Sequence, residues 1–192
     1  MCPSLDGPRG KPWLPRPSRT SDMVVNACHA IVAATSLHQL TEGVAVALAG
    51  ELGDCVIVDA SPDGEMTRSV AGPGPELAAR LSRLKPAECP LTVASTRRVT
   101  PIVYARAEDR TLLGHLPDGR TAADALHVTS VAAAPMTTGR EALGAIIIAR
   151  GGNTVAGACI TFNELWLLAE IAGLAGAALA ARLRRGQGGG AG

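Results

Sequence analysis

The chain has 192 residues, 47% of them hydrophobic but only 2% aromatic, and its formal net charge at pH 7 is +1. This length suits one domain with tails, whose core must be built from Ala, Val, Leu and Ile. A net charge so close to zero creates no strong field toward nucleic acid or an anionic membrane, so we expect neither as a partner.

The two ends of the sequence differ in composition from the part between them. Residues 1–20 contain five prolines and four basic residues but no apolar run, which predicts a disordered leader rather than a signal peptide. Residues 186–192 are rich in glycine, which predicts a flexible tail. We therefore expect the folded domain over residues 21–185.

The first half of the expected domain predicts two helices and a β-hairpin. Ser21 or Asp22 is suited to cap the first helix, because a short side-chain oxygen accepts a hydrogen bond from the first turn. Gly53 suits the left-handed conformation that ends a helix. The predicted elements are a helix from Met23 to Ala34, a helix over Leu40–Leu52, a strand over Cys55–Asp59, a turn over Ser61–Gly64 and a strand over Met66–Ala71.

The second half predicts short helices, loops and a second hairpin before a long final helix. Thr161 and Glu164 form a capping box, in which each side chain bonds to the backbone N–H of the other residue. The order of elements predicts an α+β fold with an antiparallel sheet. The predicted elements are a helix over Pro75–Leu84, a loop over Lys85–Pro90, a strand over Pro101–Tyr104, a helix over Arg120–Leu126, strands over Ser130–Met136 and Leu143–Ala149 joined by a turn over Thr138–Arg140, and a helix over Phe162–Arg184.

The final helix is apolar on more than one face. Its stretch Leu165–Leu183 resembles a membrane span, but Glu170 interrupts it and its Ala and Gly residues favour insertion only weakly, so we predict a soluble packing helix. Small residues spaced for close backbone approach suggest that one face packs on the sheet and the other on a second subunit; a helix packed wholly within one chain fits equally well. The predicted dimer interface consists of Ala169, Gly173, Gly176 and Ala180.

Three segments in this order carry a family resemblance. They are Glu51–Asp59 followed by Asp63-Gly64; Ala125–Met136 followed by Gly139-Arg140 and Leu143–Ala145; and Phe162–Leu165 leading into the final helix. Together they resemble a GAF domain, of the type found in bacterial sensor kinases and multidomain serine/threonine phosphatases. The resemblance extends over residues 22–185.

The resemblance implies a sandwich in which the N- and C-terminal helices cover one face of a central antiparallel sheet, and short helices and loops cover the other. It also implies a cytoplasmic sensory or regulatory domain that binds a small molecule or a partner protein over the sheet. Such a domain would signal through its terminal helices, in a homodimer, to a kinase or phosphatase effector. The expected ligand-binding residues are Val58, Tyr104, His115, His127, Thr129 and Met136.

Two positions depart from the family pattern. His127 stands where such domains often have Gly, and Thr129 stands where Arg is common. His127 is either a ligand-binding residue or a loop histidine bonded to the backbone. The cyclic-nucleotide signature Asn-Lys-Phe-Asp-Glu is absent and no cysteine matches the bilin attachment position, so no cofactor, haem or other chromophore is implied.

Catalytic and metal-binding patterns are scarce in the sequence. There is no Gly-x-Ser-x-Gly or phosphate-loop motif, and the four histidines are too scattered to predict a metal site. The five cysteines are interpreted as reduced thiols, and Cys89 is placed in a loop. We therefore expect no enzyme, with two alternatives to sensing left open: a ligand-free dimerisation scaffold, and a thiol-dependent methionine sulfoxide reductase using Cys89, which lacks a second loop cysteine to resolve the product.

Overall fold

The computed structural model describes residues 19–61, 64, 66–104, 106–139, 141–151 and 159–188. Most of the expected leader and the end of the expected tail lie outside these residues. Pro62, Asp63 and Arg140 of the two expected hairpin turns also lie outside them.

A five-stranded antiparallel sheet forms the centre of the molecule, with the strand order β2-β1-β5-β4-β3. Both predicted hairpins are present, as β1–β2 and β4–β5. The long strands β4 and β5 are apolar and buried along most of their length, as expected for strands covered on both faces. The strands are β1 (Cys55–Ala60), β2 (Thr67–Ala71), β3 (Ile102–Tyr104), β4 (Val128–Thr138) and β5 (Glu141–Gly151).

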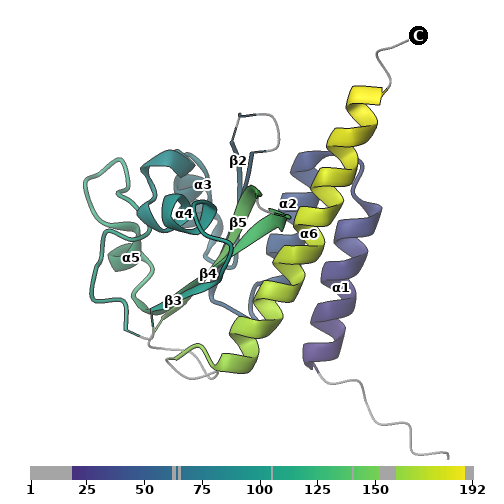
Figure 1. Cartoon of the computed structure of the whole chain (residues 1–192). Coiled ribbons are helices and arrows are strands. Elements are labelled where there is room, and N and C mark those ends of the chain that lie inside the picture. Colours follow the sequence, from purple (N-terminus) through teal and green to yellow (C-terminus); the bar gives the residue numbers. More distant parts are fainter. Residues whose placement is uncertain are drawn as a thin grey trace, which may run out of the picture.

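Helices cover both faces of this sheet, so the predicted α+β sandwich is confirmed (Figure 1). One face carries the three long helices α1 (Arg19–Ala33), α2 (Leu37–Leu48) and α6 (Phe162–Gly188). The opposite face carries α3 (Pro75–Ser82), the 3-10 turn η1 (Pro86–Glu88), α4 (Pro90–Thr96) and α5 (Ala122–Ala125).

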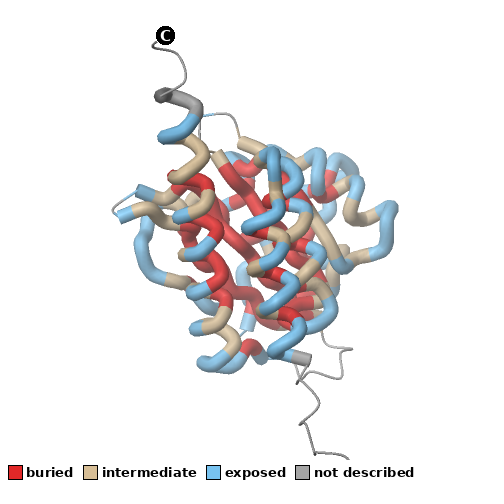
Figure 2. The backbone as a smooth tube through the Cα atoms, turned by 90° about the vertical axis from the view of Figure 1, so that its right-hand side faces the viewer, coloured by how far each residue is buried: buried red, intermediate tan, exposed pale blue. Residues whose placement is uncertain are grey.

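The alternation of side chains along β1 divides the interior into two cores. Val56, Val58 and Ala60 pack against the long helices, whereas Cys55 and Ile57 pack under the short ones. In Figure 2, which views the molecule from the side of the long helices, buried residues line the inner faces of those helices and the sheet behind them. The side of the sheet on which a β1 residue lies therefore decides which helices it contacts.

Helix α6 packs closely along β4 because it presents small residues to the sheet. A Cβ atom added to Gly176 would lie 2.5 Å from the Thr137 carbonyl oxygen, and Ala180 is only 6% exposed. Gly176 and Ala180 are thus buried within one chain, which corrects their assignment to a dimer interface. Ala169 and Gly173 are half-buried, and the space beside Gly173 is open.

By length and composition alone, the stretch Phe162–Arg185 of α6 is able to cross a membrane. Its inner face, however, belongs to the main core, with Leu168, Ile171 and Ala175 exposed by 1% or less. This packing agrees with the interpretation of α6 as a helix of the folded domain.

Several element boundaries differ from the sequence prediction. Helix α1 begins at Arg19 rather than Met23, and α2 begins after Ser36, whose hydroxyl accepts a hydrogen bond from the Gln39 amide at 3.1 Å. Helix α2 ends at Leu48, and the left-handed residue is Gly50 (φ 83°) rather than Gly53. The capping box is confirmed: the Thr161 amide donates to Glu164 Oε2 at 2.8 Å, and the Glu164 amide donates to Thr161 Oγ1 at 3.3 Å.

The segment between α3 and β3 contains a helix that the sequence analysis did not predict. Helix α4 begins at Pro90, where the missing N–H of proline is not needed, and continues through a stretch rich in β-branched residues that favour strands. Tertiary packing overrides this preference, because Leu91, Thr92 and Ser95 are buried against the sheet.

Candidate functional site

A buried polar cluster lies between the sheet and α4. The β1–β2 register places Arg68 directly opposite Asp59, on the face covered by the short helices. Arg68 Nε and Nη2 donate to the two carboxylate oxygens of Asp59, each at 2.7 Å, and the Thr92 hydroxyl of α4 donates to Asp59 Oδ2 at 2.6 Å. The side chains of Arg68 and Asp59 are 2% and 0% exposed. The bidentate ion pair therefore joins β1 to β2, and the Thr92 hydrogen bond to Asp59 anchors α4 to the sheet.

The surroundings of this cluster fix its charge state. Burial by itself lowers the pKa of the Arg68 guanidinium, but the hydrogen bonds and the charge of Asp59 raise that pKa above its ordinary value, so Arg68 stays charged. Burial raises the pKa of the neighbouring Cys55 thiol to about 12, which the Arg68 charge offsets only in part. Cys55 is therefore protonated at neutral pH and is no nucleophile.

Two polar atoms at the cluster are left without a partner. Arg68 Nη1 and Ser95 Oγ are buried and make no hydrogen bond within the described part of the chain, although the Cys89 thiol lies close enough to the Arg68 guanidinium to raise its pKa. Ser95 follows Thr92 by one helical turn on the buried face of α4. A guanidinium N–H and a hydroxyl in this position are suited to bind a molecule that offers a hydrogen-bond acceptor.

Apolar side chains surround the polar cluster and shut it off from solvent. Leu81, Leu91 and Leu113 are each at most 1% exposed in the core beneath the short helices. A cavity of about 10 Å³ borders Cys89, enough for about one water molecule. Ligand entry therefore requires α4 or the loops beside it to move.

The structure does not bring the six expected ligand residues together. Val58 and Met136 lie on the opposite side of the sheet, within the core of the long helices. Tyr104 is exposed on the edge strand β3, and His115 is exposed on the surface. The Thr129 hydroxyl donates to the Arg150 carbonyl at 3.1 Å.

His127 adopts a backbone conformation that accounts for the glycine often found at this position of the family pattern. It follows α5 with a φ of 51° and is the one non-glycine residue with a positive φ in the described part of the chain. Its side chain is exposed. Glycine adopts this left-handed conformation at the end of a helix without strain.

We expect His127→Gly to raise the free energy of unfolding by about 1 kcal/mol, because the substitution removes the steric cost of a Cβ atom at this φ. Urea denaturation monitored by circular dichroism measures the change. His38→Gly, which alters an exposed histidine inside α2, should instead lower stability. Equal losses in both variants would contradict the backbone role.

Sequence reasoning missed Asp59, Arg68 and Thr92. The signal for the ion pair was present, because Asp59 and Arg68 lie on either side of the turn at Ser61–Gly64 within two strands predicted to pair. The turn alone did not fix the register. Thr92 lies on the helix that propensity did not predict.

Cys89 is not the accessible loop thiol that a reductase requires. It is fully buried, and its Sγ donates to the Leu112 carbonyl at 3.3 Å. In the described residues there is also no group of three His, Cys, Asp or Glu side chains placed to hold a metal ion.

A second buried arginine joins the sheet to the start of α6. Arg150 of β5, 2% exposed, donates from Nε to the Leu52 carbonyl at 3.2 Å, from Nη1 to the Cys159 carbonyl at 3.1 Å and from Nη2 to Glu164 Oε1 at 2.6 Å. Burial by itself raises the pKa of Glu164. Hydrogen bonds from Arg150 and from Thr161 lower that pKa by a larger amount, so the net pKa lies below its ordinary value. Glu164 therefore serves both the helix cap and the link to β5.

We expect Glu164→Gln to destabilise the domain most at neutral pH. A carboxylate whose pKa is lowered on folding contributes stability above its unfolded pKa, about 4.3, and loses that contribution as the pH falls through the folded value. The difference in free energy of unfolding between wild type and variant should therefore be smaller at pH 3 than at pH 7. Urea denaturation of both proteins at these two pH values measures it. A constant difference across this range would contradict the assignment.

A third arginine connects the two terminal helices. Arg182 of α6 donates from Nη2 to the carbonyl oxygens of Ile31 and Ala34, at 3.1 and 2.6 Å. A cation at this position is favourable because the C-terminal end of α1 carries a partial negative charge. The ends of α1 and α6 are thereby held together.

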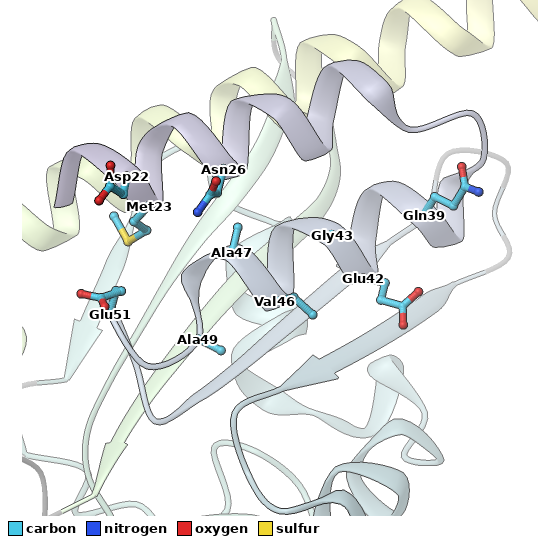
Figure 3. Close-up of a pocket in the computed structure, with 10 residues that line it drawn as sticks. All are labelled: Asp22, Met23, Asn26, Gln39, Glu42, Gly43, Val46, Ala47, Ala49 and Glu51. Carbon is cyan, nitrogen blue, oxygen red and sulfur yellow. The ribbon is translucent and has the colours of Figure 1, made fainter. Parts of the chain in front are cut away.

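A separate groove lies on the outside of the α1–α2 pair, with a volume of about 610 Å³ (Figure 3). The two helices approach closely beneath it, since a Cβ atom added to Gly43 would lie 2.8 Å from Ala30 Cβ. It is lined by Asp22, Met23, Asn26, Gln39, Glu42, Gly43, Val46, Ala47, Ala49 and Glu51.

No family model and no curated protein matches the sequence, but solved structures match its fold. The GAF domain of a phosphoenolpyruvate-protein phosphotransferase from Coxiella burnetii is 21% identical with a TM-score of 0.63, over 86% of this chain and 95% of that one. The GAF domain of nlh2 from A. aeolicus is 17% identical with a TM-score of 0.61, over 85% and 97% of the two chains. The GAF domain of the cyanobacteriochrome TePixJ is 16% identical with a TM-score of 0.54, over 80% and 94%. The five-stranded antiparallel sheet and its two helical layers are therefore the fold of a GAF domain.

Proposed function

We propose that this protein is a sensory or regulatory domain that binds a small, hydrogen-bond-accepting molecule between the sheet and α4. The observation that carries the proposal is the pair of buried, unpartnered atoms Arg68 Nη1 and Ser95 Oγ. A buried polar group without a partner costs about 1–3 kcal/mol, which a ligand that supplies the missing acceptor would recover. Similar folds in a cyanobacteriochrome and in a phosphoenolpyruvate-protein phosphotransferase support a signalling role.

A continuous set of contacts leads from the polar cluster to the terminal helices. Asp59 of β1 pairs with Ala145 of β5, and β5 also carries Arg150, which binds Glu164 at the start of α6. Arg182 near the other end of α6 binds the end of α1. A shift of the sheet on ligand binding therefore has a route to both helices, whose packing against a second copy would report it.

The surface for a second copy is an apolar stripe on the outer faces of these helices. On α6, Phe162, Trp166 and Leu174 are 79%, 59% and 49% exposed, and on α1, Val25 and Val32 are 60% and 83% exposed. This stripe, which the exposed Glu170 interrupts between Trp166 and Leu174, replaces the buried Gly176 and Ala180 of the sequence prediction. Exposed apolar groups gathered on neighbouring helices favour association.

Sedimentation velocity tests the dimer. Wild type is expected to sediment as a dimer, and Trp166→Lys combined with Leu174→Lys is expected to sediment as a monomer, because the two charges would be buried in the interface. Val46→Lys on α2 changes an equally exposed residue, 63% exposed, and should leave the dimer intact. A wild-type monomer would exclude the dimer.

Thermal shift with a library of small carboxylates, phosphates and amides tests the ligand site. A ligand that binds the native state raises the melting temperature. Ser95→Ala is expected to weaken that shift, whereas the unliganded variant should be at least as stable as wild type because an unpartnered hydroxyl has been removed.

Ser130→Ala is the matched control for this experiment. Ser130 is also buried and its hydroxyl is unpartnered in the described residues, but the strand alternation of β4 places it on the side of Ala132 and Ala134, which face the long helices. It should leave the ligand-induced shift unchanged. Equal effects of Ser95→Ala and Ser130→Ala would contradict the site.

A ligand-free dimerisation scaffold is the second candidate, and the filled interior beneath α4 favours it. A dimer in sedimentation together with no thermal shift across the library would select the scaffold. An effector kinase or phosphatase, in either case, would be bound in trans or joined to this domain.

A further inference from the structure

The groove between α1 and α2, here called the acidic groove, is defined by the ten lining residues given above. Its rim carries three carboxylates, from Asp22, Glu42 and Glu51, and all three residues are exposed. Met23, Val46 and Ala47 supply apolar surface between them, and Figure 3 shows these side chains along the two facing helices. The groove therefore combines an apolar floor with a negatively charged rim.

Beyond the first residue of α1, the two helices that form the groove carry no Lys or Arg to balance the rim. The sequence contains no Lys or Arg between Thr20 and Thr67, so α1 after its first residue, α2 and β1 are free of both. His38 lies 3.6 Å from Glu42, with its Nε2 atom facing Oε2. Within the described residues, none of the three rim carboxylates has a Lys or Arg partner. The groove thus favours a cationic occupant.

The chain itself carries a segment of the matching chemistry, directly before α1 in the sequence. Residues 1–18 contain Arg9, Lys11 and Arg16 and a single acidic residue, together with Trp13 and Leu14. This segment leads directly into α1 at Arg19, one helical turn before Asp22 at the end of the groove. Its five prolines lack an N–H, so the segment can lie in a groove while leaving few backbone donors unsatisfied.

The segment is long enough to follow the whole groove. Eighteen residues in an extended polyproline conformation reach roughly 55 Å, at about 3.1 Å per residue. The 12 residues of α2 are about 18 Å long. A tether of this length keeps the segment at an effective concentration on the order of millimolar, so weak contacts are sufficient for occupancy.

We propose that residues 1–18 of this chain dock in the acidic groove between α1 and α2, with their basic side chains paired to the rim carboxylates and Trp13 on the apolar floor. The occupied groove lies apart from the polar cluster under α4. Docking is therefore independent of the ligand site proposed above.

Fluorescence of Trp13 tests the docking in the full chain. The sequence has two tryptophans, so Trp166→Phe leaves Trp13 as the sole reporter. Docking predicts that acrylamide quenches Trp13 about twofold less efficiently at low ionic strength than in 1 M NaCl, where surface charge pairs are screened. Equal quenching at both salt concentrations would overturn the proposal.

Charge reversal identifies the groove as the binding surface. In the Trp166→Phe background, Glu42→Lys with Glu51→Lys should raise Trp13 quenching at low salt to its high-salt value. The matched control, Glu108→Lys with Glu141→Lys, makes the same charge change at exposed sites outside the groove lining and should retain the protection. Loss of protection in the control as well would show a general field effect and overturn the site.

A charge swap tests whether the groove variant lost the protection of Trp13 through charge repulsion or through misfolding. Adding Arg9→Glu, Lys11→Glu and Arg16→Glu to the groove variant should restore the protection of Trp13, which a misfolded groove would not allow. Protection that grows with protein concentration would assign the segment to the groove of a second copy and overturn docking within one chain.

Discussion

Asp59→Leu alone is expected to lower the free energy of unfolding by about 3–5 kcal/mol, because it leaves the Arg68 guanidinium buried without its counter-charge. The same loss is expected of Arg68→Met, which strands the Asp59 carboxylate. Both side chains are almost fully buried and bonded in bidentate geometry. Urea denaturation at pH 7 measures both changes.

The double variant Asp59→Leu with Arg68→Met separates the effect of an uncompensated charge from the effect of altered packing. Replacing both charges by apolar groups removes the uncompensated charge, so the double variant should be more stable than either single variant. Strictly additive losses would show that the two charges do not depend on each other. A stable double variant would also give a folded protein in which the proposed ligand site lacks its guanidinium.

Gly176→Ala is expected to lower the free energy of unfolding by about 2 kcal/mol. The added methyl group would lie 2.5 and 2.7 Å from the backbone oxygen and nitrogen of Thr137, so α6 or β4 must move to accept it. This cost exceeds the gain of about 1 kcal/mol that alanine provides over glycine inside a helix. The expected result is a lower urea midpoint.

Gly173→Ala is the control on the same helix. No atom lies within 4 Å of a Cβ placed at Gly173, so the substitution should show only the helix-propensity gain, up to about 1 kcal/mol. Opposite signs for two identical substitutions one turn apart would identify the face of α6 that packs on the sheet. A gain in both variants would contradict the close approach of α6 to β4.

The local chain patterns predicted most of the elements correctly. The β-branched run at Cys55–Asp59, the turn after it and the apolar run at Leu143–Ala149 yield the strands of the two hairpins, since strand pairing across a short turn is a local interaction. The capping box at Thr161–Glu164 likewise lies where it was expected. Helix α4 was missed because its β-branched residues favour strands and only burial against the sheet makes it helical.

The site could not be predicted in the same way. Val58 and Asp59 are adjacent in the chain but lie on opposite faces of the sheet. An error of one residue in deciding which β1 side chains face the long helices therefore places Val58 in the site and Asp59 in the core. Thr92 joins Asp59 from 33 positions away, a distance that no local pattern spans.

The sequence by itself therefore determined the hairpins, the long terminal helix and the resemblance to the GAF fold, because these depend on turn chemistry, helix capping and the period of apolar residues. Only the tertiary structure decided which small residues of α6 meet the sheet, since small side chains permit close approach to a strand as readily as to another helix. It also decided that a buried ion pair under α4 rather than the histidines forms the candidate site, because Asp59, Arg68 and Thr92 come together through strand register and long-range packing.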